Sequence, residues 1–181
     1  MTSELIPFLS AKDIEKIVGT LADQISKEYK EKLQGKSDLT IVVILKGAMF
    51  FAADLIRRLS LPLGIEFVTL ASYGGGTKTT GKVRILKDIE TDPLNRHILI
   101  LDEIADSGHT LSFLKARLEA ARPSSVKICT LLSKPSRREL PIEVDFLGRE
   151  VEDKFLVGYG LDFNERYRNL PDIYILKGGG Q

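Results

Sequence analysis

Apolar residues recur along the chain in two patterns, helical stripes and short unbroken runs. Helical spacing follows a capping-type start at residues 10–13, then returns over 48–59 and from Leu111 to Ala121, where Pro123 ends it. The unbroken runs predict strands, some buried on both faces. They cover residues 39–45, 64–70, 83–86, 98–101, 126–132, 144–147, 155–159 and 173–176. Alternating strands and helices predict an α/β fold with a twisted, mainly parallel sheet flanked by helices.

Ligands of such sheets bind beyond the carboxyl ends of the strands. The loops to consider therefore follow Leu45, Leu70, Leu101, Leu132 and Val157. Each loop carries polar or glycine residues, and residues 72–82, rich in Gly and Thr, predict a mobile segment.

Composition narrows the class of protein. A chain of 181 residues suffices for one domain with a sizeable core, and its net charge of +1 gives no basic field for nucleic acid. The single cysteine, Cys129, excludes an internal disulfide and fits a reducing, cytoplasmic setting. We expect no secretory signal and no membrane span, because Lys46, Gly47 and Asp54 interrupt the longest apolar stretch.

The richest chemistry lies in the run HILILDEIADSGHTL, residues 97–111. Asp102 and Glu103, at the end of a predicted strand, suit two vicinal hydroxyls or a hydrated Mg²⁺. Backbone N–H groups and hydroxyls after Asp106 suit a monophosphate at a helix N-terminus, and Gly108 permits close approach. For any one of the acids, capping of the helix is an equally good interpretation. That alternative does not account for the whole string.

The segment LILDEIADSGHTL resembles the phosphoribosyl-pyrophosphate (PRPP) binding motif of type I phosphoribosyltransferases. Four further segments are similar to the hypoxanthine-guanine members of that family: LKGA at 45–48, SYG at 72–74, LLSK at 131–134 and FLVGYGLD at 155–162. These matches run in the family order from about residue 39 to 173. The resemblance implies a single domain over residues 1–181, with a core at about 37–150. A small hood would come from the N-terminal segment and about 151–181.

Two positions depart from the family pattern. The acid pair usually reads Glu-Asp, but here it is Asp102-Glu103, so the arms that hold the ribose and metal differ by one carbon each. Gly160 replaces a more common Ala, which we expect to be a minor change.

The resemblance implies Mg²⁺-dependent transfer of 5-phosphoribosyl from PRPP to N9 of hypoxanthine and/or guanine, a purine salvage reaction that releases pyrophosphate. Asp106 would accept the proton at purine N7. Asp102 and Glu103 would contact the ribose hydroxyls and Mg²⁺. The 5-phosphate would lie in the turn formed by Ser107, Gly108, His109 and Thr110.

The pyrophosphate would meet the backbone of Lys46 and Gly47, with Arg168 as a second contact. In the family the peptide before this lysine can be cis. A solvated strand-end lysine and an ordinary surface arginine are the alternatives. Ser72 and Tyr73 would open a lid over residues 72–84, whose alternative is a hairpin tip without a role.

The purine would be read by residues from the second half of the chain. Lys134 would donate to the exocyclic O6, the backbone of Leu156 would read the purine edge, and Phe155 would stack on the ring, unless it is a core aromatic. Asp162 would bind a second Mg²⁺ or cap the turn at Asn164. The ranking of hypoxanthine, guanine and xanthine stays open.

Two other functions compete with salvage. A PRPP-binding or nucleotide-binding regulator on the same fold usually lacks an acid or a base-reading group, but here Asp106, Lys134 and Phe155 are all present. A nucleoside triphosphatase would need G-x-x-x-x-G-K-[ST], which does not occur. The resemblance also implies a homodimer or homotetramer, with no nucleic-acid or membrane partner.

Overall fold

The computed structural model of the protein describes residues 4–33, 39–73 and 82–178. Its main sheet has six strands in the order β4-β3-β2-β5-β6-β7. All neighbours are parallel except β3 and β4, which confirms the α/β class with a mainly parallel sheet. The strands are β2 (Leu39–Leu45), β3 (Leu63–Tyr73), β4 (Lys82–Lys87), β5 (His97–Ala105), β6 (Ser125–Ser133) and β7 (Phe146–Glu150).

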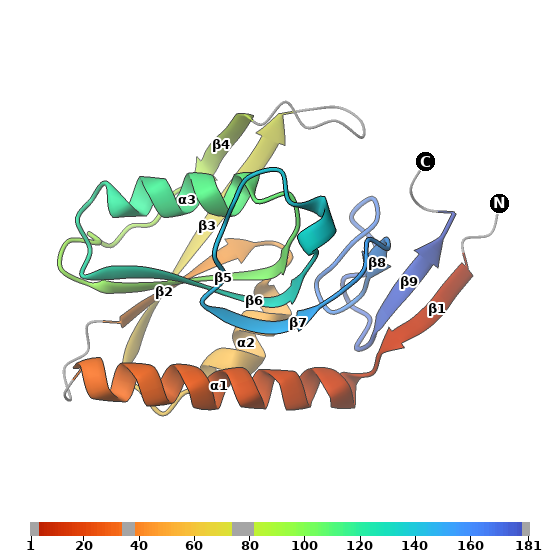
Figure 1. Ribbon diagram of the computed structural model, residues 1–181, viewed down its shortest axis with the longest axis horizontal. Coiled ribbons are helices and arrows are strands. Elements are labelled where there is room, and N and C mark those ends of the chain that lie inside the picture. The colour runs from red at the N-terminus through yellow and green to blue at the C-terminus, as the bar shows by residue number, and fades with distance from the viewer. Residues whose placement is uncertain (1–3, 34–38, 74–81, 179–181) are drawn as a thin grey trace.

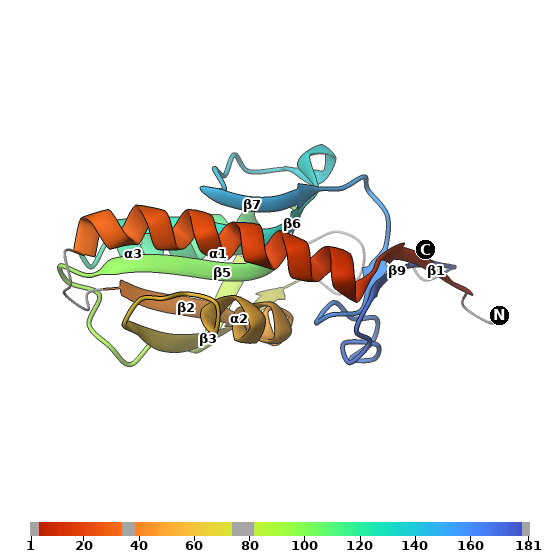
Figure 2. The same ribbon diagram turned by 90° about the horizontal axis from the view of Figure 1, so that it is seen from below.

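Helices cover both faces of this sheet (Figures 1 and 2). On one face, α1 (Ala11–Leu33) and α2 (Met49–Ile56) pack on a core that includes Ile41 and Leu99. On the other, α3 (His109–Glu119) packs on a second core that includes Val42 and Ile100. Alternate residues of β2 and β5 thus enter opposite cores, as the pleat of a strand requires, and both faces of these strands are buried.

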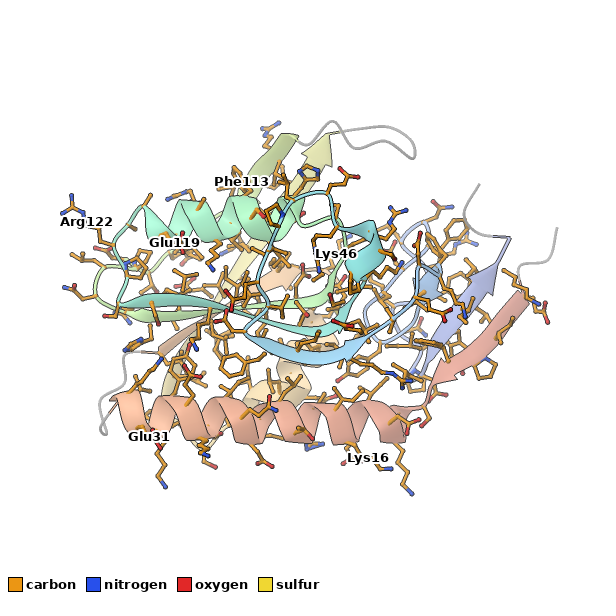
Figure 3. All side chains as sticks on the ribbon, in the orientation of Figure 1. Lys16, Glu31, Lys46, Phe113, Glu119 and Arg122 are labelled. Atoms are coloured by element: carbon orange, nitrogen blue, oxygen red, sulfur yellow. The ribbon has the colours of Figure 1, made fainter. Side chains whose placement is uncertain are left out.

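The long helix α1 follows the predicted amphipathic pattern. Its N-terminus carries a capping box, because Ser10 Oγ donates to Asp13 Oδ2 at 2.6 Å and accepts from the Asp13 N–H at 3.2 Å. Lys16 and Glu31 project away from the sheet (Figure 3). The opposite stripe is buried and consists of Ile14, Val18, Leu21, Ala22, Ile25, Tyr29 and Leu33.

A second, three-stranded sheet has the order β1-β9-β8 and lies beyond the carboxyl ends of β2, β5 and β6 (Figure 1). It contains β1 (Glu4–Leu9), β8 (Leu156–Val157) and β9 (Ile173–Lys177), with β9 antiparallel to both neighbours. The apolar runs did not predict β1. Its segment includes a proline, and β9, its strand partner among the described residues, is at the other end of the chain.

Among the predicted boundaries that differ from the structure, three have a local cause. α2 ends at Ile56, because Arg58 and Leu59 donate to the carbonyls three residues back and tighten the chain into a turn. β7 begins at Phe146, since the Asp145 carboxylate, rather than a neighbouring strand, accepts the Ile128 N–H at 2.8 Å. β8 ends at Val157, because left-handed backbone at positions 158 and 159 turns the chain.

The predicted lid is described only at its base. Ser72 and Tyr73 form the end of β3 and pair with Val83 and Lys82 of β4. Residues 74–81 of the predicted lid lie outside the described residues. No helix in the described parts of the chain is long and apolar enough to cross a membrane.

Candidate active site

The two adjacent acids lie within a strand rather than in a loop. β5 continues past Leu101 and pairs with β6 as far as Ala105, so the predicted strand end at Leu101 is wrong. Although successive side chains of a strand alternate, the carboxyl groups of Asp102 and Glu103 lie close enough to share a hydrogen bond. Asp102 lines a small cavity with Ser107 and Thr110, and Glu103 lies against Gly47. The pair therefore lies between the small cavity and the segment that carries Gly47.

Burial governs the electrostatics of both acids. Burial raises the pKa of Asp102 well above its usual value, and the neighbouring Glu103 charge raises it further. Burial also raises the pKa of Glu103, against the lowering effects of hydrogen bonds and the Arg168 charge. A cation beside them would favour their ionised forms. No group of three or more His, Cys, Asp or Glu side chains in the described residues could hold a metal alone. A hard cation here would therefore need substrate oxygens and water to complete its shell.

The small cavity, about 70 Å³, forms where β5 turns into α3. Gly108 is the N-cap of α3, with φ of +92°, and a Cβ atom there would lie 2.7 Å from the Leu140 carbonyl oxygen. The N-cap residue makes no side-chain capping hydrogen bond, and the Asp106 carboxylate accepts instead from Arg137 Nε at 3.1 Å. His109 Nε2 lies 2.8 Å from Glu139 Oε2. The hydroxyls of Ser107 and Thr110 and the start of the helix suit a small anion, whereas Asp102 and Asp106, which also line the cavity, suit hydroxyls or a cation beside it.

The segment after β2 packs tightly against the acids and the chain after β8. The Leu45–Lys46 peptide is cis. A Cβ atom on Gly47 would lie 1.8 Å from Glu103 Oε1, so the carboxylate rests directly on this glycine. Gly160 has φ of +100°, and its Cβ would lie 1.9 Å from the Gly47 carbonyl oxygen. The expectation that alanine at position 160 differs little is therefore wrong, because this backbone conformation and this contact both require glycine.

Charged residues form a chain beside Gly160. The Arg168 guanidinium donates to the Gly160 carbonyl at 2.7 Å and lies 2.9 Å from Asp162 Oδ1. The nitrogen that contacts Asp162, Nη2, also lies 3.3 Å from Glu165 Oε1, and Glu165 Oε2 pairs with Lys46 Nζ at 2.7 Å. The hydrogen bond from Lys46 lowers the pKa of Glu165. Asp162 Oδ2 also accepts the Glu165 N–H at 2.9 Å, so it caps this turn. Lys46 lies at the carboxyl edge of the main sheet (Figure 3).

A larger cavity of about 400 Å³ opens beside the small one. Lys134 is 7% exposed at the end of β6, and its N–H donates to the Ala105 carbonyl at 2.9 Å. Phe155 is 39% exposed and meets Phe163 edge-on at 5.6 Å, so it is not a core aromatic. The lining residues are Glu103, Ile104, Asp106, Lys134, Arg137, Asp153, Phe155, Leu156, Leu161 and Asp162.

The structure thus brings most of the predicted site residues to one edge of the sheet. Four charged residues in or beside the cavities were missed: Arg137, Arg138, Asp153 and Glu165. The two arginines belong to the run KPSRR after a buried strand, a basic cluster that was a usable signal. Asp153 and Glu165 carry no such signal, because Asp153 pairs with a separate segment and Glu165 joins the nearby Arg168 to the distant Lys46.

Comparison with known proteins decides the family. The family model for the phosphoribosyl transferase domain matches residues 8–164. The chain belongs to this family. The phosphoribosyltransferase is 43% identical over 165 residues to a hypoxanthine phosphoribosyltransferase of Haemophilus influenzae, with 91% of each chain covered. It is also 43% identical over 169 residues to a hypoxanthine-guanine phosphoribosyltransferase of Staphylococcus epidermidis, covering 93% of this chain and 92% of the relative.

A solved structure agrees with these relatives. The crystal structure of a hypoxanthine phosphoribosyltransferase from Staphylococcus aureus superposes with a TM-score of 0.88 at 41% identity. The match covers 94% of this chain and 90% of that one. The phosphoribosyltransferase is therefore an enzyme of the pentosyl-transfer class, and catalysis is favoured over a purely regulatory role.

Proposed function

We propose that this phosphoribosyltransferase moves the 5-phosphoribosyl group of PRPP to N9 of hypoxanthine and/or guanine, giving IMP or GMP. The observation that carries the proposal is the larger cavity, in which the buried ammonium of Lys134, the Asp106 carboxylate and the exposed ring of Phe155 meet beside the small polar cavity. The names of the relatives support the same substrate class.

The reaction breaks the bond between the ribose anomeric carbon and the pyrophosphate oxygen, and N9 forms the new bond. The purine loses a proton, which Asp106 accepts at N7. Positive charge develops on the ribose while the leaving polyanion departs. The protein must therefore hold the reactants in line and exclude water that would capture the sugar. Phe155 holds the ring by stacking, and the Leu156 backbone meets its edge.

The 5-phosphate and the pyrophosphate of PRPP have separate sets of contacts. The turn of Ser107, Gly108, His109 and Thr110 holds the 5-phosphate at the start of α3. The Lys46–Gly47 backbone and Arg168 receive the pyrophosphate. Arg168 is suited to this task, because its planar fork matches phosphate oxygens. Its side chain is already fixed by the Gly160 carbonyl. The described ends of the lid, Ser72 and Tyr73, lie at the tip of β3.

The acid pair fits a divalent cation. Asp102 is buried and Glu103 half-buried, the pKa values of both are raised, and both neighbour the proposed phosphate and pyrophosphate subsites. We assign them to the ribose hydroxyls and one Mg²⁺, and Asp162 to a second. When bound, Mg²⁺ supplies charge neutralisation of the pyrophosphate, with substrate and water oxygens completing its shell.

Lys134 sets the choice between 6-oxo and 6-amino purines. An ammonium donates hydrogen bonds and cannot accept them, so O6 satisfies it whereas the 6-amino group of adenine does not. Leaving a buried donor unpaired costs about 1–3 kcal/mol, or about 5- to 150-fold in kcat/KM.

A purine panel tests the proposal. Hypoxanthine, guanine, xanthine and adenine are each incubated with PRPP and Mg²⁺, and nucleotide formation is followed. We expect turnover of hypoxanthine and/or guanine and little with adenine. Adenine as the best substrate would exclude the role given to Lys134. No turnover of any 6-oxopurine would favour the regulatory alternative.

The exposed apolar side chains of β3 support self-association as a homodimer or homotetramer. Ile65 and Phe67 are paired with Ile41 and Val43, so they extend the apolar face covered by α1 and α2, yet both are exposed. Light scattering on the eluting protein should give a dimer or tetramer mass, and Phe67→Glu should shift it towards the monomer. A monomeric wild type would contradict this. The buried free thiol of Cys129 supports a cytoplasmic location.

A further inference from the structure

One tight turn places two cations side by side in the larger cavity. The 3₁₀ turn η1 (Pro135–Arg137) follows Lys134, and the Arg137 N–H donates to the Lys134 carbonyl at 3.1 Å. Side chains three residues apart lie in line in a 3₁₀ turn, which has three residues per turn. Lys134 and Arg137 therefore face the same side, and both line the cavity.

Asp153, from the segment between β7 and β8, lies between these cations. Its Oδ1 is 3.6 Å from Lys134 Nζ, and its Oδ2 is 3.7 Å from Arg137 Nη1. Each carboxylate oxygen thus faces one cation. Because Lys134 is buried and a buried ammonium is costly without a paired anion, Asp153 supplies the charge that its position requires.

Arg137 also pairs with Asp106, the proposed proton acceptor. Its Nε donates to Asp106 Oδ1 at 3.1 Å. The neighbouring Arg138 holds the backbone of Asp106 by donating to its carbonyl at 2.7 Å. Arg138 also donates to Ser133 Oγ at 2.9 Å. An unbroken series of charges, Asp106–Arg137–Asp153–Lys134, therefore runs along one wall of the cavity. The charge of Asp106 correspondingly raises the pKa of Arg137.

The two ends of this series match the two polar atoms on one edge of a 6-oxopurine. O6 and N7 are neighbours on that edge, and the proposed function gives O6 to Lys134 and N7 to Asp106. In that assignment Arg137 and Asp153, the two middle residues of the series, contact neither O6 nor N7. Arg137 and Asp153 are about half exposed, and exposed ion pairs contribute little to folding, so their arrangement serves the site rather than the fold.

We propose that Arg137 and Asp153 are positioning residues, which fix the spacing between the O6 donor Lys134 and the N7 proton acceptor Asp106. This inference rests on the proposed function and extends it. The arginine fork is essential, because one guanidinium reaches Asp106 through Nε and Asp153 through Nη1, whereas a lysine ammonium would pair with only one of them. A bound purine would exclude water from the series and strengthen its interactions.

Steady-state kinetics on Asp153→Asn, Arg137→Gln and Arg137→Lys test the proposal, with hypoxanthine and PRPP varied separately. Asp153→Asn should raise the KM for hypoxanthine about tenfold or more, because it releases the donor that binds O6. Arg137→Gln should lower kcat about tenfold or more, because it releases the proton acceptor. Arg137→Lys should recover only part of that loss. The KM for PRPP should stay within about twofold throughout, a selectivity that general loosening of the fold would not produce.

Two matched controls separate position from charge. Glu152→Gln removes an exposed acid from the same segment, where it pairs with Lys154 at 2.8 Å outside the cavity. Arg117→Gln removes an arginine that is 47% exposed, like Arg137, and pairs with Asp88. Both controls should match the wild type in kcat and in both KM values.

The double variant Arg137→Gln/Asp153→Asn gives a further criterion. If the two residues act as one series, its loss in kcat/KM should be smaller than the product of the single losses. The inference is overturned if the variants behave like the controls, if Arg137→Lys equals the wild type, or if the KM for PRPP rises with that for hypoxanthine. A wild type without turnover would instead overturn the proposed function itself, so the two failures are distinguishable.

Discussion

Replacing Gly160 with alanine should destabilise the protein and disturb the pyrophosphate side of the site. Gly160 has φ of +100°, where a residue with a side chain is strained by about 1–3 kcal/mol. Its new Cβ would lie 1.9 Å from the Gly47 carbonyl oxygen, and Cβ atoms are essentially never found closer than 3.0 Å to such an atom. Backbone must therefore move by about 1.1 Å, which costs about another 1–3 kcal/mol.

The expected loss is thus about 2–6 kcal/mol of unfolding free energy, a large part of the 5–15 kcal/mol of a typical domain. Urea unfolding followed by far-ultraviolet circular dichroism measures it, since the chain has no tryptophan to report by fluorescence. Because the displaced segment carries Lys46 and Gly47, the KM for PRPP should rise more than the KM for the purine.

Gly19→Ala is the matched control. Gly19 lies within α1, and a Cβ atom there would meet nothing within 4 Å. Alanine should therefore stabilise the helix by about 0.5–1 kcal/mol, the opposite sign. A Gly160→Ala protein within about 0.5 kcal/mol of the wild type, with its KM for PRPP unchanged, would refute the reasoning from φ and contact distance.

Two further predictions concern single carboxylates. Asp106→Asn should lower kcat about 100-fold or more with little change in unfolding free energy, and an unchanged kcat would leave Asp106 without a role in proton transfer. Thr91→Val should destabilise the protein at pH 7, because the Thr91 hydroxyl hydrogen bond holds the pKa of Glu66 below its usual value. Since that pKa is lowered on folding, the stabilisation is present above pH about 4.5 and disappears as the pH falls through the folded value. Urea unfolding of both proteins from pH 7 to pH 3 checks this, and a stability difference that does not shrink in acid would contradict it.

The parts of the fold that the sequence predicts well are those in which local pattern and final burial agree. Residues 39–45 are apolar throughout because β2 is covered on both faces, and the run matches the strand bounds. α1 is recognisable because its buried stripe recurs at helical spacing behind a capping box. In both cases one segment carries the whole signal.

Other features depend on partners far away along the chain. β1 is a strand because β9 pairs with it, and its own sequence includes Pro7. The requirement for glycine at position 160 comes from the Gly47 carbonyl, more than a hundred residues earlier. The link between Arg137 and Asp153 joins two segments that neither periodicity nor motif connects. For the site, the motif therefore indicated which residues bear chemistry, but not the contacts that hold them in place.

The central place of β9 in the small sheet determines the order in which parts of the protein can fold during synthesis. Within the described part of the chain, β1 and β8 each pair with β9 alone, and the Leu176 N–H also donates to the Phe155 carbonyl at 2.9 Å. During synthesis, at about 5–20 residues per second, β1 must wait about 10–30 seconds for its partner to emerge. The main sheet can assemble during that interval, because its last strand, β7, ends at Glu150. The purine cavity is then the last part of the enzyme to be completed, so a nascent chain acquires its fold before it acquires its substrate site.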